Sequence, residues 1–136
     1  MSRAGGYWQR VLAADMAVPA DRPLAELVGE LVGLLGSPAA ALRDETAYPV
    51  LATWIERGAC DELLVGLGDE LVAALRPGPG GRGSDAVFRR SFSALVLAEC
   101  VERDTAARVL PDGTVARWCG AVTAWLLGED DLRGFV

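Results

Sequence analysis

Apolar residues along this 136-residue chain recur three or four positions apart in successive segments, separated by glycine and proline. This spacing places the apolar side chains of each segment on one face of an α-helix. The pattern predicts one domain over residues 1–136, which contains a capping helix at 1–20 and helix pairs at 23–58, 60–104 and 114–136. We expect the last pair to be truncated.

Single residues modify these predicted helices. Pro49 lies inside the second helix of the first pair, where it removes a backbone donor and should bend the helix. Gly66 and Gly68 are expected to be weak points of the following helix. Residues 77–83, which are rich in glycine and proline, are predicted to form a flexible linker inside the second pair.

Two of the predicted helices are copies of one another. Residues 42–57 align without gaps on residues 88–103, at a shift of 46 residues, the separation of Arg43 and Arg89. HEAT and armadillo units recur at about 40–47 residues. The repeat therefore predicts an all-α fold: a HEAT-like, right-handed stack of antiparallel helix pairs, or α-solenoid, with an incomplete third pair. The identical pairs are Arg43/Arg89, Val50/Val96, Leu51/Leu97, Ala52/Ala98, Glu56/Glu102 and Arg57/Arg103.

The repeat register continues to the end of the sequence. Leu132-Arg133 takes the place that Phe88-Arg89 takes in the second pair, so a third copy begins there and stops. The preceding helix, Thr114–Leu127, then lacks its partner. Leaving several hundred Å² of apolar surface in water costs several kcal/mol, at about 25 cal/mol per Å². We expect a homo-oligomer through Thr114–Leu127, a second polypeptide, or a truncated gene product.

Composition narrows the function classes. The net charge is −6, all 13 basic residues are arginine, and histidine is absent. Without His or Lys, no imidazole base, imidazole metal ligand or Schiff base can form, which disfavours an enzyme without excluding one. The acidic surface disfavours nucleic acid and anionic membranes as partners. The bias toward residues with GC-rich codons indicates a bacterial, actinobacterial source.

Targeting and cofactor signals are weak. No apolar run is long enough to span a bilayer and no signal-type segment opens the chain, so we expect a cytoplasmic protein. The acidic cluster at 129–131 is a candidate for a divalent ion, but capping of a helix is the stronger interpretation. We expect no cofactor and no metal. The three cysteines, Cys60, Cys100 and Cys119, are expected to be buried, with a reactive thiol as the alternative.

Charged residues open the two copied helices and form the candidate site. Arg43, Asp44, Arg89 and Arg90 have two interpretations. They form either a ladder between repeats, in which Asp44 meets Arg89 or Arg90, or a row that binds a partner or an anion. Tyr48 falls off the apolar face of its helix and is expected along the concave side. These five residues are the candidate partner-binding set.

Three runs resemble one bacterial family. In order, the runs are residues 45–55, residues 85–97 and Asp131-Leu132-Arg133-Gly134. Over residues 24–136 the chain resembles the family described as domain of unknown function 2785. The resemblance implies a HEAT-type helical fold and no established activity. It also implies that relatives continue past the Leu-Arg-Gly segment into a further, His-containing helical half.

These observations favour a non-enzymatic scaffold that binds a protein or peptide through the face of the second helices. The alternative is one half of a ligand-binding or enzymatic α-solenoid, completed by another chain or by a missing C-terminal half. The two hypotheses differ in where the chemistry lies. An enzyme requires a closed pocket lined by titratable groups with shifted pKa values, whereas a scaffold requires an open surface.

Overall fold

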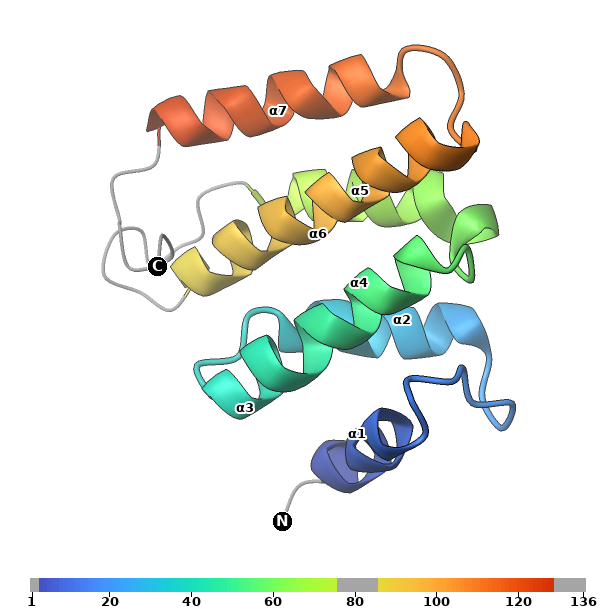
Figure 1. Cartoon of the computed structure of the whole chain (residues 1–136). Helices are drawn as coiled ribbons and strands as arrows, with labels where there is room; N and C mark the ends of the chain where they lie inside the picture. The colour runs from blue at the N-terminus through green and yellow to red at the C-terminus, as the bar shows by residue number, and fades with distance from the viewer. Residues whose placement is uncertain (1–2, 76–85, 129–136) are drawn as a thin grey trace.

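A computed structural model describes residues 3–75 and 86–128, and the regular structure in these two ranges is entirely helical (Figure 1). The predicted all-α class is therefore confirmed. The predicted linker at 77–83, the acidic cluster at 129–131 and the start of a third copy at Leu132 lie outside the described residues. The elements are α1 (Arg3–Ala13), α2 (Leu24–Leu34), α3 (Ala40–Leu42), the π turn η1 (Arg43–Ala47), α4 (Tyr48–Glu56), the 3₁₀ turn η2 (Asp61–Leu63), α5 (Leu64–Ala73), α6 (Ala86–Ala107) and α7 (Thr114–Gly128).

The helices are stacked in chain order from α1 at one end to α7 at the other (Figure 1). In this view α2 lies behind α4 and α5 lies behind α6, so the middle of the molecule is two helices deep. α6 packs against both α4 and α5, and α7 packs mainly against α5. The long second helix of the first pair is divided into α3, η1 and α4.

The bend expected at Pro49 takes the form of the π turn η1, which ends two residues before the proline. A proline ring inside an α-helix collides with the carbonyl group four residues earlier, here that of Glu45. A π turn is wider than an α turn, and it provides that space without ending the helix. Pro49 then lies within the first turn of α4, a position where a missing N–H group costs little.

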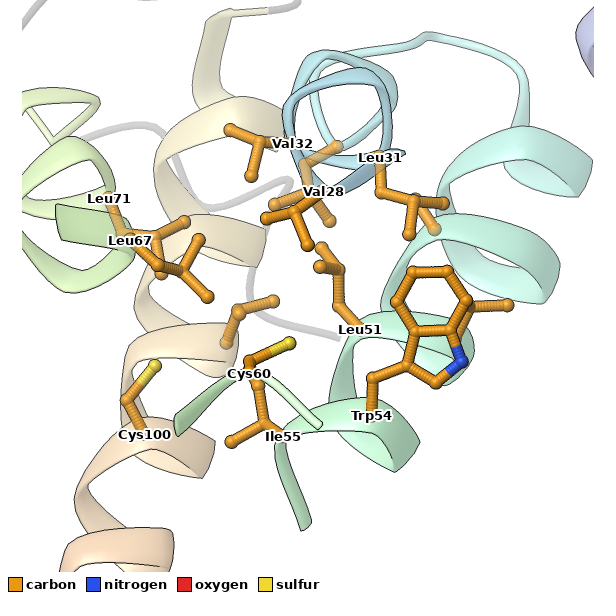
Figure 2. Close-up of a cluster of buried hydrophobic side chains, with 14 of the residues drawn as sticks. Val28, Leu31, Val32, Leu51, Trp54, Ile55, Cys60, Leu67, Leu71 and Cys100 are labelled. Carbon is orange, nitrogen blue, oxygen red and sulfur yellow. The ribbon is translucent and has the colours of Figure 1, made fainter. Parts of the chain in front are cut away.

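A single hydrophobic core runs through the stack. Figure 2 shows side chains from α2, α4, α5 and α6 pointing toward one another around Leu51 and Cys60. Trp8 of α1 extends this core at one end, where its ring centre lies 6.0 Å from that of Trp54. Trp118 of α7 closes the other end, and all three indoles are fully buried. These three tryptophans are therefore core residues.

The expected weak point at Gly68 is instead a contact point. A Cβ atom on Gly68 would overlap the Trp118 ring and would lie only 2.6 Å from its Cε2 atom. Gly66, two residues earlier on the same helix, has nothing within 4 Å of such a Cβ. Because only a glycine lets the indole approach α5 this closely, Gly68 fixes where α7 docks.

Candidate functional site

Arg43 is a structural residue that joins the two helix pairs. Its side chain is buried, and its Nε atom donates to Asp44 Oδ1 at 2.7 Å while Nη1 donates to the carbonyl of Ser37 at 3.0 Å. Its guanidinium lies 4.2 Å from the ring centre of Phe88 and 5.2 Å from that of Phe92. Stacking of arginine on aromatic faces of α6 therefore connects the repeats at this position.

Tyr48 does not lie open on a concave surface, contrary to the expectation from its helical position. The side chain is half-buried, and its ring packs edge-to-face on Phe92 with centres 6.2 Å apart. Its hydroxyl donates to Glu99 Oε1 at 3.1 Å. Burial first, and the adjacent Glu99 carboxylate second, raise the pKa of Tyr48 to about 12. The neighbouring helix α6 covers a face that looks free in the sequence of α4 alone.

The remaining candidates do not form one surface. Asp44 pairs with Arg43, its neighbour in the chain, and the Asp44 pairs expected with Arg89 or Arg90 are not among the ion pairs of the described residues. Arg90 is buried, whereas Arg89 is exposed and its stem packs 3.2 Å from the position of a Cβ on Gly36. The predicted row is thus mostly built into the contact between the helix pairs.

A different feature is an apolar groove between α6 and α7, near the C-terminal end of the described residues. Its volume is about 390 Å³. The groove exists because α7 docks on α5 and touches α6 along only a short length. Glu102 is the charged residue at its edge. The groove is lined by Ala94, Leu97, Ala98, Val101 and Glu102 of α6 and by Trp118, Cys119, Val122 and Thr123 of α7.

Polar contacts hold α7 in the position that creates the groove. Asp69 of α5 accepts hydrogen bonds from Trp118 Nε1 at 3.0 Å and from Arg117 Nη1 at 2.7 Å. These two donors, Trp118 first, lower the pKa of Asp69. Farther along α7, Leu126 is 50% exposed and Leu127 is 85% exposed. An apolar face on this helix was expected from the repeat register, and α7 does carry exposed leucines beside the groove.

Cys119 is exposed on the groove side of α7, so its expected burial was wrong. The helical pattern places Cys119 next to Trp118, but it is the Trp118 ring that lies against Gly68 of α5, and Cys119 faces the groove. Cys60 and Cys100 are buried as expected. Burial raises the pKa of Cys60 to about 11 and that of Cys100 to about 12, which keeps both thiols protonated.

A second groove, of about 270 Å³, lies on α1 and the segment that follows it. The Tyr7 hydroxyl donates to Asp21 Oδ1 at 3.0 Å, and the guanidinium groups of Arg10 and Arg22 lie over the Tyr7 ring at 5.7 and 5.0 Å. Val18 is 40% exposed beside it. The groove is lined by Tyr7, Arg10, Val11, Ala14, Ala17, Val18, Pro19 and Asp21.

The titratable groups with the most strongly raised pKa values do not line either groove. Tyr48, Cys60 and Cys100 all lie between helices in the interior. Within residues 3–75 and 86–128, no three His, Cys, Asp or Glu side chains are grouped as a metal site would require. No helix in that part of the chain has both the length and the apolarity to cross a bilayer.

The fold and the two grooves define an all-helical protein of packed helix pairs with apolar concave surfaces at both ends. A family model described as protein of unknown function (DUF2785) matches residues 78–136. The resemblance seen in the sequence is therefore confirmed, although the match begins at residue 78 and not at residue 24. No curated protein and no solved structure matches the chain.

Sequence reasoning missed the α6/α7 groove as a site. The signal was present in the repeat register, which assigns Thr114–Leu127 to the position of a first helix, against which a second helix would pack. The charged residues at the helix starts drew the prediction to another surface, because a sequence does not show which charges the next helix covers. The groove also needs the Gly68–Trp118 contact, which joins residues 50 positions apart, from Gly68 to Trp118.

Proposed function

We propose that this protein is a HEAT-like, right-handed α-solenoid that binds an amphipathic helix of a protein partner in the α6/α7 groove. The supporting observation is the place of the groove in the repeat. α6 packs against both α4 and α5 and buries Val96, Leu97 and Cys100 there. The next position along the stack, against α6 and α7, is open in the described part of the chain. Since repeats stack by the same contacts, a helix like α6 fits this position.

The residues that line the groove determine which side chains the partner helix must present. Ala94, Ala98 and Val101 are small or medium in size, so they admit a partner face of bulky apolar side chains. Glu102 at the edge favours a basic residue on the partner helix. The net charge of −6 adds a field that speeds association with a basic partner.

This proposal keeps the class of function expected from the sequence and changes the surface. The face of the second helices was expected to bind the partner, but Arg43 and Tyr48 are occupied by contacts between the helix pairs, and Arg90 is buried. The groove, by contrast, is apolar, concave and accessible. An accessible apolar groove is the usual receptor for an amphipathic helix.

The test is titration of the protein with a synthetic peptide of residues 86–107, the α6 sequence, which presents the face that α6 itself buries. Binding is followed by tryptophan fluorescence, because Trp118 lines the groove. The control peptide carries Glu in place of Val96 and Cys100. We expect saturable binding of the first peptide and at least tenfold weaker binding of the control.

Groove variants assign the binding to this surface. Ala98 is exposed and lines the groove, so Ala98→Arg should fold normally and weaken peptide binding at least tenfold, which corresponds to about 1.4 kcal/mol. Ala106 is exposed on the same helix outside the groove, and Ala106→Arg is the matched control. Equal peptide affinity for the two variants would show that the groove is not the binding site.

We also propose a cytoplasmic location. The three cysteines are free thiols, and a protein in an oxidising compartment usually pairs its cysteines. Fractionation of cells that express the full chain tests this, and recovery in the envelope fraction would contradict it.

A further inference from the structure

The internal repeat extends further toward the N-terminus than the sequence alignment indicates. Arg57 of the first pair donates to Asp15, and Arg103 of the second pair donates to Asp61. Both contacts join residues 42 positions apart. In each contact, an arginine near the end of one second helix binds an aspartate in the segment just after the preceding second helix. α1 therefore occupies the position of a second helix, equivalent to α4 and α6.

The tryptophans give the same register. Trp8 of α1 and Trp54 of α4 are separated by the same 46 residues that separate Arg57 and Arg103, and both are fully buried. Within the described residues, α1 is thus a second helix without a first helix before it. Within the same residues α7 is the opposite case, a first helix with no second helix described after it. The two ends of the described stack are therefore complementary, because one is a second helix and the other is a first helix.

We propose that the occupant of the α6/α7 groove is α1 of a second copy of this chain, so that copies associate head to tail. This inference rests on the proposed function, because it names the helix that the groove accepts. The docked α1 would pack against α6 and α7 in the same way that α6 packs against α4 and α5. The contact is heterologous, since different surfaces of the two copies meet, and it leads to a ring or a chain of copies.

The observed packing of α4 on α6 predicts which residues meet. Tyr48 of α4 donates to Glu99 of α6, 51 positions later. In the docked arrangement α6 takes the role of α4, and α1 of the second copy takes the role of α6. In the 46-residue register, Ala94 corresponds to Tyr48, and Tyr7 corresponds to Glu99 two repeats earlier. Tyr7 of the second copy therefore lies opposite Ala94 of α6. Both residues line grooves, Tyr7 the groove on α1 and Ala94 the α6/α7 groove. A large side chain thus meets a small one at the predicted contact.

The same register brings opposite charges together. Tyr48 of α4 contacts two residues of α6: Phe92, which is 44 positions later, and Glu99, which is 51 positions later. The repeat offset of 46 lies between these two values. At the repeat offset of 46, Arg10 of the second copy lies opposite Glu102. Arg10 and Glu102 are both exposed and both line their grooves. This local pair offsets the repulsion between two chains of net charge −6.

The experiment measures the mass of the full chain in solution by sedimentation over a range of concentrations. The wild type is expected to form species larger than a dimer as concentration rises. Ala98→Arg blocks the groove end, and Arg10→Glu blocks the α1 end; each alone should weaken association at least tenfold. Gln9→Glu, an exposed neighbour outside the α1 groove, is the control and should associate like the wild type.

Mixing the two blocked variants gives the sharpest result. Ala98→Arg retains a working α1 end and Arg10→Glu retains a working groove, so an equimolar mixture should form one dimer and stop. Adding Glu102→Arg to Arg10→Glu should restore association by exchanging the charges.

Three outcomes overturn the inference. If the wild type stays monomeric while the α6 peptide binds, the groove serves another partner and the proposed function stands. If the wild type stays monomeric and the peptide does not bind, both proposals fail. A dimer that is lost in Ala98→Arg but unchanged in Arg10→Glu would show that two grooves meet face to face, not head to tail.

Discussion

The contact between Gly68 and Trp118 makes the most specific stability prediction. A methyl group on Gly68 overlaps the indole, whereas a methyl group on Gly66 meets nothing within 4 Å. Both glycines lie inside α5. Gly66→Ala should therefore stabilise the protein by about 0.8–1 kcal/mol, the difference in helix propensity between alanine and glycine.

Gly68→Ala gains the same propensity and adds the collision. Forcing an extra methyl group into a packed contact costs about 1–3 kcal/mol. Because the propensity gain cancels between the two variants, their difference in free energy of unfolding measures the collision alone. We expect Gly68→Ala to be less stable than Gly66→Ala by about 1–3 kcal/mol, measured by urea unfolding followed by circular dichroism at one protein concentration.

A second background identifies the cause. Trp118→Leu removes the ring that the new methyl group meets, so adding Gly68→Ala to Trp118→Leu should cost nothing and gain the propensity term. Equal stabilities of Gly66→Ala and Gly68→Ala in the natural background would refute the claim that this glycine fixes the docking of α7.

Three further predictions concern charge, a hydroxyl group and a thiol. The Arg103 hydrogen bond lowers the pKa of Asp61, so its stabilisation is present above the usual aspartate pKa of about 3.9 and is lost as pH falls through the folded-state pKa. Arg103→Gln should therefore reduce the loss of stability in acid, whereas the exposed Arg57→Gln should change little, as measured by thermal unfolding between pH 6 and pH 3 (about the range set by that pKa). The buried Ser93 hydroxyl has no hydrogen-bond partner in the described part of the chain, so Ser93→Ala should raise the unfolding free energy by about 0.5–1.5 kcal/mol in urea titration; a loss would contradict an unpaired hydroxyl. Cys119 should be the one thiol that an aromatic disulfide reagent labels rapidly at neutral pH, since burial keeps the other two protonated; rapid labelling of two or three thiols would contradict the structure.

Local patterns in the sequence determined the helices and their order. Apolar spacing and the positions of glycine and proline report on neighbours within about one turn, so α2, α5, α6 and α7 appear close to where the sequence predicts them. The copied arginine-led helices also indicated that the elements repeat. Both the apolar spacing and the repeat can be read from the sequence without knowing which helices pack together.

Only the tertiary structure decided which side chains are covered. Arg43 and Tyr48 look like an open row on their own helix, but α6 crosses them and turns both into contacts between helix pairs. Gly68 looks like a defect in α5 until the Trp118 ring lies against it. In each case the deciding neighbour is more than 40 residues away, as in the 51-residue separation of Tyr48 and Glu99.

The two ends of the molecule divide in the same way. The sequence by itself assigned Thr114–Leu127 to the position of a first helix, because the repeat register can be counted along the chain. The assignment of α1 to the second-helix position required the Arg57–Asp15 and Arg103–Asp61 contacts, which a search for identical residues does not find. Sequence identity records which residues were copied, whereas packing records which positions are equivalent even after their residues have diverged.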